Sequence, residues 1–196
     1  MSLKSCRQAL VLFAISFLFS TTAQAHWELY NDGSTLSFVT TKADNVAEVH
    51  TFDRLGGSIG DDGSLEITIE LASVNTLIPI RNERMQNLLF ETGMFPQARV
   101  TGKVDIAAIA ALPAGDTLIV PVEFTLNLHS RSNPLTAEIV VTRQADGLVA
   151  ATRKPVIVTA EAFGLEAGVE ALREIAGLSR ISHAVPVSFV VEFHRD

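Results

Sequence analysis

Cysteine is almost missing from this chain. The single cysteine, Cys6, lies near the start of the sequence, so the rest of the chain has no thiol for a disulfide or for a cysteine-ligated metal. A domain without these supports depends on an ordinary packed core for its stability. The 171 residues that follow residue 25 (196 minus 25) are enough to build such a core as one domain.

Positive charge is also scarce. The whole sequence has 15 lysines and arginines against 22 acidic residues. Without Lys4 and Arg7, which precede the first apolar run, the count is 13 against 22, a formal charge of −9. A surface of that sign repels phosphate backbones and anionic lipid headgroups, so nucleic-acid binding is not expected. The acidic residues are dispersed along the chain, as on a solubilising exterior.

Only one apolar run is long, and it lies near the start of the chain. Residues 9–19 form this run, with Lys4 and Arg7 before it and the small-residue motif at residues 23–25 after it. A spanning helix needs about 20 apolar residues. A basic start, a short apolar centre and a small-residue cleavage site are typical of a secretory signal peptide. We therefore predict a signal peptide over residues 1–25, cleavage after Ala25, one domain over residues 26–196 and a periplasmic location.

The pattern that the sequence does have in abundance is period-two alternation. Residues 65–71 alternate leucine and isoleucine with glutamate and threonine, and residues 118–128 repeat the pattern over a longer run. Alternation of this kind predicts strands with one buried side and one solvent-facing side. The Asp-Gly pair at residues 62–63, between two such segments, indicates a hairpin turn.

Two segments depart from the strand pattern. Residues 81–90 and residues 164–177 place apolar side chains at helical spacing. The remaining segments give eight or nine strands. A closed antiparallel barrel is the favoured arrangement, because closure removes exposed strand edges. The predicted fold is mainly β: an eight-stranded antiparallel barrel with one or two short helices.

The order and spacing of these segments resemble the YceI family of exported, lipocalin-like proteins. The likeness covers nearly all of residues 26–196. The segments that carry it are Trp27 with residues 34–38, Phe52 with residues 57–59, residues 67–76, residues 81–84 with Phe90, Phe95 with Pro96, residues 126–129 and residues 162–164. Each segment is short, and their succession makes the resemblance specific.

The resemblance implies a lipocalin-like barrel whose apolar tunnel holds an isoprenoid chain, such as a quinone tail or a polyprenyl lipid. It implies no reaction and no cofactor. Four positions differ from the family's usual residues: Asn82 stands in place of aspartate, Arg84-Met85 in place of His-Leu, and Ser130 in place of glycine. We expect the helix at residues 81–90 to line the mouth of the tunnel.

A lipid tail needs a dry channel, because each buried methylene contributes about 0.8 kcal/mol and an unpaired buried polar group costs more than that. The inward-facing residues of the predicted strands are the candidate ligand contacts. They are Phe38, Ile67, Ile69, Leu71, Val104, Phe124, Leu126, Ile139, Val141, Val187, Phe189 and Val191. The same alternation also fits a barrel filled by its own side chains, so the pattern alone leaves both interiors open, and the resemblance favours the hollow one.

Arg81 and Arg84 are the candidate contacts for the head group of the ligand, a phosphate or a quinone oxygen. Both lie in the predicted helix at residues 81–90. The alternative is that these arginines pair with Glu83 or Glu91 on a solvated helix.

The five histidines form no recognisable metal motif. They are His26, His50, His129, His183 and His194. Cleavage after Ala25 would, however, expose the α-amine and the imidazole of His26 together. This chelate could bind Cu(II) with one further imidazole, from His50 or His194. Copper binding at His26 is therefore an alternative, and no other metal site is predicted.

No catalytic constellation is evident. The neighbouring His129 and Ser130 would point to opposite sides of a strand. We predict a non-enzymatic periplasmic carrier or reservoir for an isoprenoid lipid or quinone, with no cofactor. The alternatives are the copper-binding protein and a solid barrel that contacts proteins in stress defence or membrane redox assemblies. A membrane redox partner and a homodimer are both compatible with the sequence.

Overall fold

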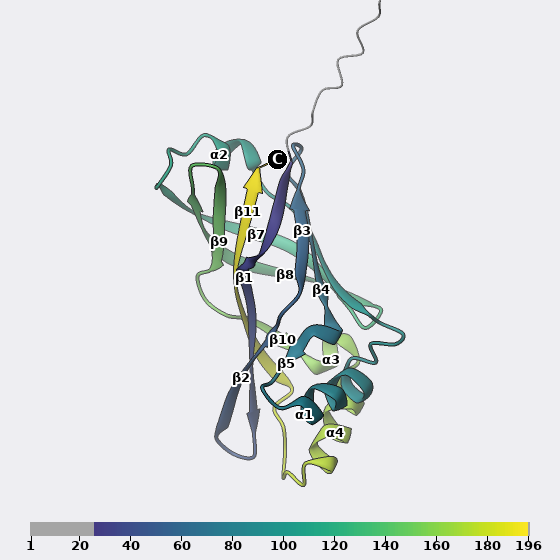
Figure 1. Cartoon of the computed structure of the whole chain (residues 1–196). Helices are drawn as coiled ribbons and strands as arrows, with labels where there is room; N and C mark the ends of the chain where they lie inside the picture. Colours follow the sequence, from purple (N-terminus) through teal and green to yellow (C-terminus); the bar gives the residue numbers. More distant parts are fainter. Residues whose placement is uncertain (1–25, 196) are drawn as a thin grey trace, which may run out of the picture.

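The computed structural model describes residues 26–195, shown in Figure 1. The predicted signal peptide lies outside the described residues. The strands are β1 (Trp27–Lys42), β2 (Val46–Phe52), β3 (Leu55–Ile59), β4 (Ser64–Glu70), β5 (Val74–Asn75), β6 (Gln97–Lys103), β7 (Thr117–Leu128), β8 (Arg131–Arg143), β9 (Gly147–Thr152), β10 (Val156–Thr159) and β11 (Ala184–Arg195). The helical segments are η1 (Leu71–Ser73), α1 (Pro79–Arg84), η2 (Met85–Leu89), α2 (Ile106–Ala110), α3 (Ala160–Phe163) and α4 (Glu166–Ile175). None of these helices is long and apolar enough to span a membrane.

Eight of the strands close into a ring. Neighbours pair antiparallel in the order β1, β3, β4, β6, β7, β8, β9, β11, and the pairing of β11 with β1 completes the circle. The prediction of a mainly β fold built on an eight-stranded antiparallel barrel is therefore confirmed. The other three strands, β2, β5 and β10, lie outside this ring.

The two strands that close the ring also extend beyond it. The first part of β1 pairs with β3, whereas residues 36–42 pair with β2. In the same way, the last part of β11 pairs with β9 and its first part with β10. The register of β1 against β11 shifts between Tyr30 and Thr35. At one end of the molecule, β10, β11, β1, β2 and β5 therefore form a sheet that leaves the ring (Figure 1).

Helices complete the wall at this open end. Figure 1 shows α1 and α4 at the bottom of the molecule, beside the extended sheet, and α2 at the top. Helix α4 packs closely on η2: a Cβ atom placed on Gly168 would lie 2.6 Å from the carbonyl oxygen of Leu88 and 2.8 Å from the Cα of Leu89. Both helices predicted from the sequence are present, and glycine at position 168 lets them approach each other.

The opposite end of the barrel is filled by side chains. Trp27, Leu148 and Phe193 are 3%, 1% and 1% exposed, and the guanidinium groups of Arg143 and Arg195 lie over the Trp27 ring. We call this region the packed end. Its buried residues are Trp27, Leu29, Ile59, Ile109, Val122, Ala137, Ile139, Val141, Leu148, Val191 and Phe193.

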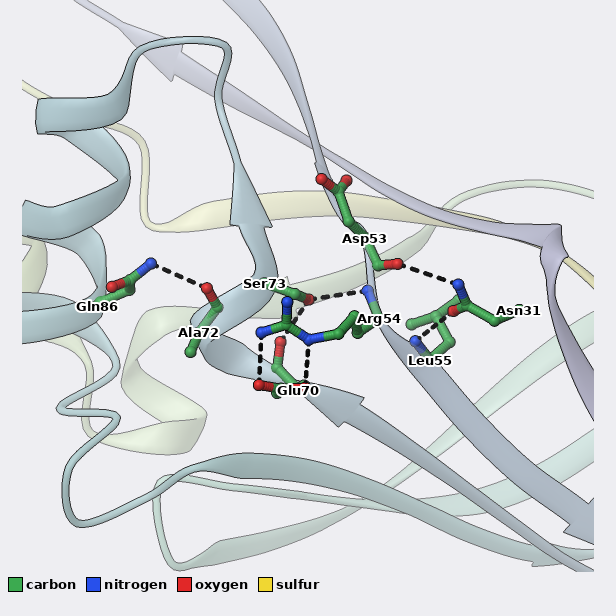
Figure 2. A network of polar contacts seen from close by, with 8 residues as sticks. All are labelled: Asn31, Asp53, Arg54, Leu55, Glu70, Ala72, Ser73 and Gln86. Atoms are coloured by element: carbon green, nitrogen blue, oxygen red, sulfur yellow. Dashed lines mark hydrogen bonds and ion pairs between the residues drawn. The ribbon is translucent and has the colours of Figure 1, made fainter.

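A polar network fixes the segment that leads from the barrel to the helices (Figure 2). Arg54 forms an ion pair with Glu70, and its backbone N–H donates to the Ser73 hydroxyl over 3.0 Å. The Gln86 side-chain amide then donates to the carbonyl of Ala72 over 2.9 Å, which ties η2 to η1. The helices at the open end are therefore held to the strand framework by directed bonds as well as by packing.

Candidate functional site

The barrel encloses an apolar cavity of about 450 Å³. This volume lies in the range of about 300–1,000 Å³ that is usual for small-molecule sites. Its walls come from the strands near the open end and from α1, η2 and α4, and the exposed side chains of Ile78, Ile80 and Arg84 belong to its lining. The cavity therefore reaches the surface beside α1. We call this part of the molecule, defined by the cavity lining, the hollow end.

Most of the predicted ligand contacts lie around this one space. Seven of the twelve candidates line the cavity, and they come from β1, β4, η1, β7 and β11. These seven are Phe38, Ile69, Leu71, Phe124, Leu126, Val187 and Phe189. Residues far apart in the sequence are thus brought together by barrel closure, as the alternation predicted.

The other five candidates lie away from the cavity. Ile139, Val141 and Val191 are buried in the packed end, and Ile67 and Val104 are partly buried against the same core. The physical reason is that period-two alternation states which side of the sheet a residue faces, but not its height along the barrel. A residue can face inward and still meet other side chains rather than open space.

The lining changes from apolar to polar along two paired strands. On β1 the inward residues run from Leu36 and Phe38 to Thr40 and Lys42, and the partner positions on β2 run from Phe52 through His50 to Glu48. The polar members lie toward the hairpin that joins the two strands. A ligand with an apolar tail and one polar group would match this gradient in a single orientation.

Two cations share one carboxylate at the polar side of the cavity. The Lys42 Nζ lies 2.7 Å from Glu48 Oε2, and the Arg81 Nη1 lies 2.8 Å from the same oxygen. The hydrogen bond from Lys42 and the charge of Arg81 hold the pKa of Glu48 below its usual value. We call Thr40, Lys42, Glu48, His50 and Arg81 the polar corner.

His50 is the most buried member of the polar corner. It is 3% exposed, its Nε2 lies 3.0 Å from the Thr40 hydroxyl, and its ring packs edge-on against Phe38. Burial lowers the pKa of His50, and the nearby charge of Arg81 lowers it further. The imidazole is therefore neutral at pH 7. Its Nδ1 is buried and has no hydrogen-bond partner among residues 26–195.

The two arginines predicted to contact the head group both line the cavity, in different environments. Arg81 is partly buried, and its Nη2 donates to the Thr76 carbonyl over 2.7 Å in addition to the bond with Glu48. Neither Arg81 nor Arg84 pairs with Glu83 or Glu91 within residues 26–195. Arg84 is exposed at the rim.

Asn82 holds the start of α1 in place. Its Oδ1 accepts a hydrogen bond from the backbone N–H of Thr76 over 2.9 Å and a second from the Thr76 hydroxyl over 2.5 Å. Thr76 itself is 3% exposed. Because both bonds need only an acceptor, asparagine can fill the position where the family usually has aspartate. This contact fixes the first turn of α1 and thereby positions Arg81, which precedes Asn82 in the helix.

Helix α4 and the segment after it form a wall that the sequence reasoning missed. Leu165, Val169, Leu172, Ala176 and Leu178 line the cavity. The apolar stripe of α4 was visible in the sequence, but its partner was not. His50 was missed for a different reason: its strand turns Glu48 and His50 inward and leaves Val49 67% exposed. The signal in the sequence was the period-two spacing of Glu48, His50 and Phe52, which places all three on the same side of the strand.

The histidine at the predicted cleavage site lies at the packed end. Glu28, two residues after His26, is paired in register with His194, whereas His50 pairs with Phe38 further along β1. Within residues 26–195, no group of three or more histidine, cysteine, aspartate and glutamate side chains is arranged to hold a metal ion. Copper binding through the α-amine of His26 stays a prediction.

Comparison with known families agrees with this geometry. The YceI-like domain matches residues 27–193, so the chain belongs to the YceI family, and the resemblance read from the sequence is confirmed. A comparison with curated protein sequences finds no match.

Three solved structures show the same architecture. A polyisoprenoid binding domain from Saccharophagus degradans, implicated in plant cell wall breakdown, is 39% identical, with a TM-score of 0.85, and the alignment covers 87% of this chain and 98% of that one. BcnA from Burkholderia cenocepacia is 17% identical, with a TM-score of 0.65 over 84% and 98% of the two chains. The YceI protein of Campylobacter jejuni is 16% identical, with a TM-score of 0.51 over 73% and 82%. The last two show the fold alone.

Proposed function

We propose that this protein is a non-enzymatic periplasmic carrier or reservoir for an isoprenoid lipid, either a quinone or a polyprenyl compound. The observation that carries the proposal is the apolar cavity of about 450 Å³ at the hollow end. The alternative, a barrel filled by its own side chains along its whole length, is inconsistent with a cavity of this size. An isoprenoid chain is stabilised in such a space because its methyl and methylene groups leave water.

The relationship to the Saccharophagus degradans protein supports an isoprenoid as the ligand. That protein is a polyisoprenoid binding domain, and its 39% identity extends over 98% of its length. The hollow end of the present chain offers the corresponding chemistry, since apolar side chains dominate the cavity and polar groups gather at one corner.

The surface beside the cavity mouth supports exchange of a lipid with a membrane or with another carrier. Leu77, Ile78 and Ile80 are 87%, 44% and 52% exposed, and the last two also line the cavity. Exposed apolar side chains next to an apolar cavity give a tail a short path that avoids water. The periplasmic part of the proposal depends on the signal-peptide pattern in residues 1–25.

The proposal can be tested by native mass spectrometry of the protein that is expressed from the full-length sequence and purified from a bacterial periplasm, followed by lipid extraction. We expect a bound mass that matches a polyprenyl compound or a quinone. The matched control is Ala98→Phe, which places a large ring at a buried position of the cavity wall and should yield protein without the bound mass. Wild-type protein that is free of lipid and takes up no added geranylgeraniol would contradict the proposal.

A further inference from the structure

The segment that joins β5 to α1 exposes four apolar residues in succession. Leu77, Ile78 and Ile80 are 87%, 44% and 52% exposed, and Pro79 between the two isoleucines is exposed as well. Single exposed aliphatic side chains are common on protein surfaces, whereas an exposed run of this length is unfavourable unless it has a function. We call residues 77–80 the apolar rim.

The first residue of the apolar rim also carries a cost in its backbone. The φ of Leu77 is 62°, in the left-handed region, where a residue with a Cβ is strained and glycine is not. Leu77 therefore combines this strain with the largest exposure among the large apolar side chains of residues 26–195. Glycine would remove both costs, so the stability of the fold does not explain a leucine at this position.

Hydrogen bonds hold the apolar rim in its exposed position. The backbone N–H of Leu77 donates to Asn75 Oδ1 over 2.9 Å. The preceding residue, Thr76, is fixed through its N–H, which donates to Asn82 Oδ1, and through its carbonyl, which accepts from Arg81 over 2.7 Å. The turn thus presents the leucine side chain to solvent by directed contacts.

The apolar rim is continuous with the cavity. Ile78 and Ile80 line the cavity and are exposed at the same time, so whatever covers this surface lies over the opening beside α1. A lipid layer in contact with the rim would bring its acyl chains next to the cavity, and an isoprenoid tail could pass between them without crossing water. A protein seated on the rim would instead cover the opening.

The size of the apolar rim also favours a lipid layer over a protein partner. A stable protein interface uses about 20–30 residues on each side, and the apolar run ends after four, because Glu83 and Arg84 are the next exposed residues in α1. Insertion into a lipid layer needs no complementary partner surface and grows with the apolar area that leaves water. The acidic excess of the chain gives no general attraction to anionic headgroups, so burial of the rim is the driving force.

We propose that the apolar rim docks the protein on a phospholipid bilayer, with the side chains of Leu77, Ile78 and Ile80 inserted at the level of the acyl chains. The isoprenoid enters and leaves the cavity at this contact. This inference rests on the proposed function and adds the partner with which the ligand is exchanged. Insertion of three side chains gives a weak and reversible contact, as a carrier requires.

The test is flotation with vesicles of phosphatidylcholine, using protein expressed from the full-length sequence and purified from a bacterial periplasm. We expect the wild type to float with the vesicles at both low and high salt. Leu77→Ser should lower the partition coefficient about tenfold, through the loss of one inserted leucine side chain. The matched control is Met94→Ser, because Met94 is 67% exposed but does not line the cavity; its partition should equal that of the wild type.

A second variant, Leu77→Gly, separates docking from folding. Because glycine relieves the backbone strain, this variant should unfold at a temperature about 2–4 °C higher than the wild type, yet bind vesicles about tenfold more weakly. A purely structural role for the leucine would not combine higher stability with weaker docking. Geranylgeraniol added without vesicles should bind both Leu77 variants as tightly as the wild type, because Leu77 lies outside the cavity lining.

The outcomes distinguish the docking proposal from the proposed function. Wild-type protein that binds geranylgeraniol but does not float with vesicles, or Leu77→Ser that floats as well as the wild type, would overturn the docking proposal and leave an isoprenoid carrier. A wild-type dimer in light scattering that Leu77→Ser converts to a monomer would assign the rim to a second copy of the chain instead. Failure of the wild type to bind geranylgeraniol at all would overturn the proposed function itself.

Discussion

The packed end and the hollow end are made from the same alternating strands, yet only one of them is filled. On β11, Phe193 is 1% exposed in the packed end, whereas Phe189 lines the cavity. The difference follows from the pairing of the closing strands. Where β1 pairs with β3 and β11 with β9, the ring is closed. Where their partners become β2 and β10, helices replace strands in the wall and the side chains no longer meet.

The largest expected contrast comes from removing one phenylalanine ring at each end. Phe193→Ala should lower the free energy of unfolding by about 3–5 kcal/mol, as usual for a fully enclosed ring. Phe189→Ala should cost about 1–2 kcal/mol, because the part of the ring that borders the cavity has fewer contacts to lose. Urea denaturation followed by circular dichroism measures both. Equal losses would contradict the division into two ends.

Adding volume should sharpen the comparison in the opposite direction. Ala137→Leu enlarges a side chain in the packed end and should cost about 1–3 kcal/mol of stability through overpacking. Ala98→Leu enlarges a cavity-lining side chain and should cost less than about 1 kcal/mol, while it weakens geranylgeraniol binding several-fold. Urea unfolding measures the stability, and displacement of the fluorophore N-phenyl-1-naphthylamine by geranylgeraniol measures the affinity. A larger stability loss in Ala98→Leu than in Ala137→Leu would argue against free space beside Ala98.

The contact between helices at the hollow end can be tested at Gly168. Alanine is favoured over glycine inside a helix by about 1 kcal/mol, but its Cβ would lie 2.6 Å from the Leu88 carbonyl oxygen. We expect Gly168→Ala to destabilise the protein by about 1–2 kcal/mol despite that preference. The matched control is Gly93→Ala, since no atom lies within 4 Å of the added Cβ; its stability should change by less than about 0.5 kcal/mol. A stabilised Gly168→Ala would show that α4 is not tightly packed on η2.

The hairpin between β7 and β8 provides a change in stability that leaves the cavity intact. Its turn residues His129 and Ser130 have φ values of 52° and 60°, a conformation that glycine adopts without strain. Ser130→Gly restores the family's usual residue and should stabilise the protein by about 0.5–1 kcal/mol in thermal unfolding. Ligand affinity should stay the same. A loss of stability would mean that the serine side chain compensates for the turn strain.

The smallest expected effect is a pH dependence confined to the hollow end. His183 Nδ1 lies 2.6 Å from Glu161 on α3, and its Nε2 lies 3.7 Å from Glu170 on α4. The hydrogen bond to Glu161 raises the pKa of His183 above 6.5. Hydrogen bonds from the backbone and from His183 lower the pKa of Glu161. The pKa of Glu170 is also lowered, mainly by its hydrogen bond with Arg173.

The signs of these shifts define a window of stability. The contribution of His183 is complete below its unfolded pKa of 6.5 and is lost as the pH rises through the raised pKa, whereas the carboxylate contributions are lost as the pH falls below 4.5. Hydrogen exchange in α4 should therefore be slowest between about pH 4.5 and 6.5 after correction for intrinsic rates. His183→Gln should flatten the upper side of this profile and leave the exchange of β9 unchanged. An unchanged α4 profile in that variant would remove His183 from the account.

The fold was largely predictable because its signals are local and repeated. Alternation at residues 65–71 and 118–128 predicted β4 and β7, and the Asp-Gly pair at residues 62–63 predicted the turn between β3 and β4. The apolar stripes at residues 81–90 and 164–177 predicted the helices at the hollow end. Each signal depends only on the geometry of the strand or helix that contains it.

The site was only partly predictable, because its key property is long-range. Ile69 and Ile139 have the same inward position in the sequence pattern, but only Ile69 borders the cavity. The difference depends on which strands pair at each height of the barrel, and no local pattern records that. His50 shows a second obstacle. Its strand inverts the usual alternation, because polar His50 faces inward and apolar Val49 faces solvent. The contacts of His50 with Thr40 and its proximity to Arg81 are visible only in the folded structure.

The most direct test of the account is a methyl NMR titration of the full domain with geranylgeraniol, which reports every isoleucine methyl at once. The Ile69 signal at the hollow end should shift on binding, while the Ile139 signal at the packed end should stay in place. Equal shifts at both residues, a shift at Ile139 alone, or no shift at either would contradict a cavity that holds an isoprenoid at one end of a half-filled barrel.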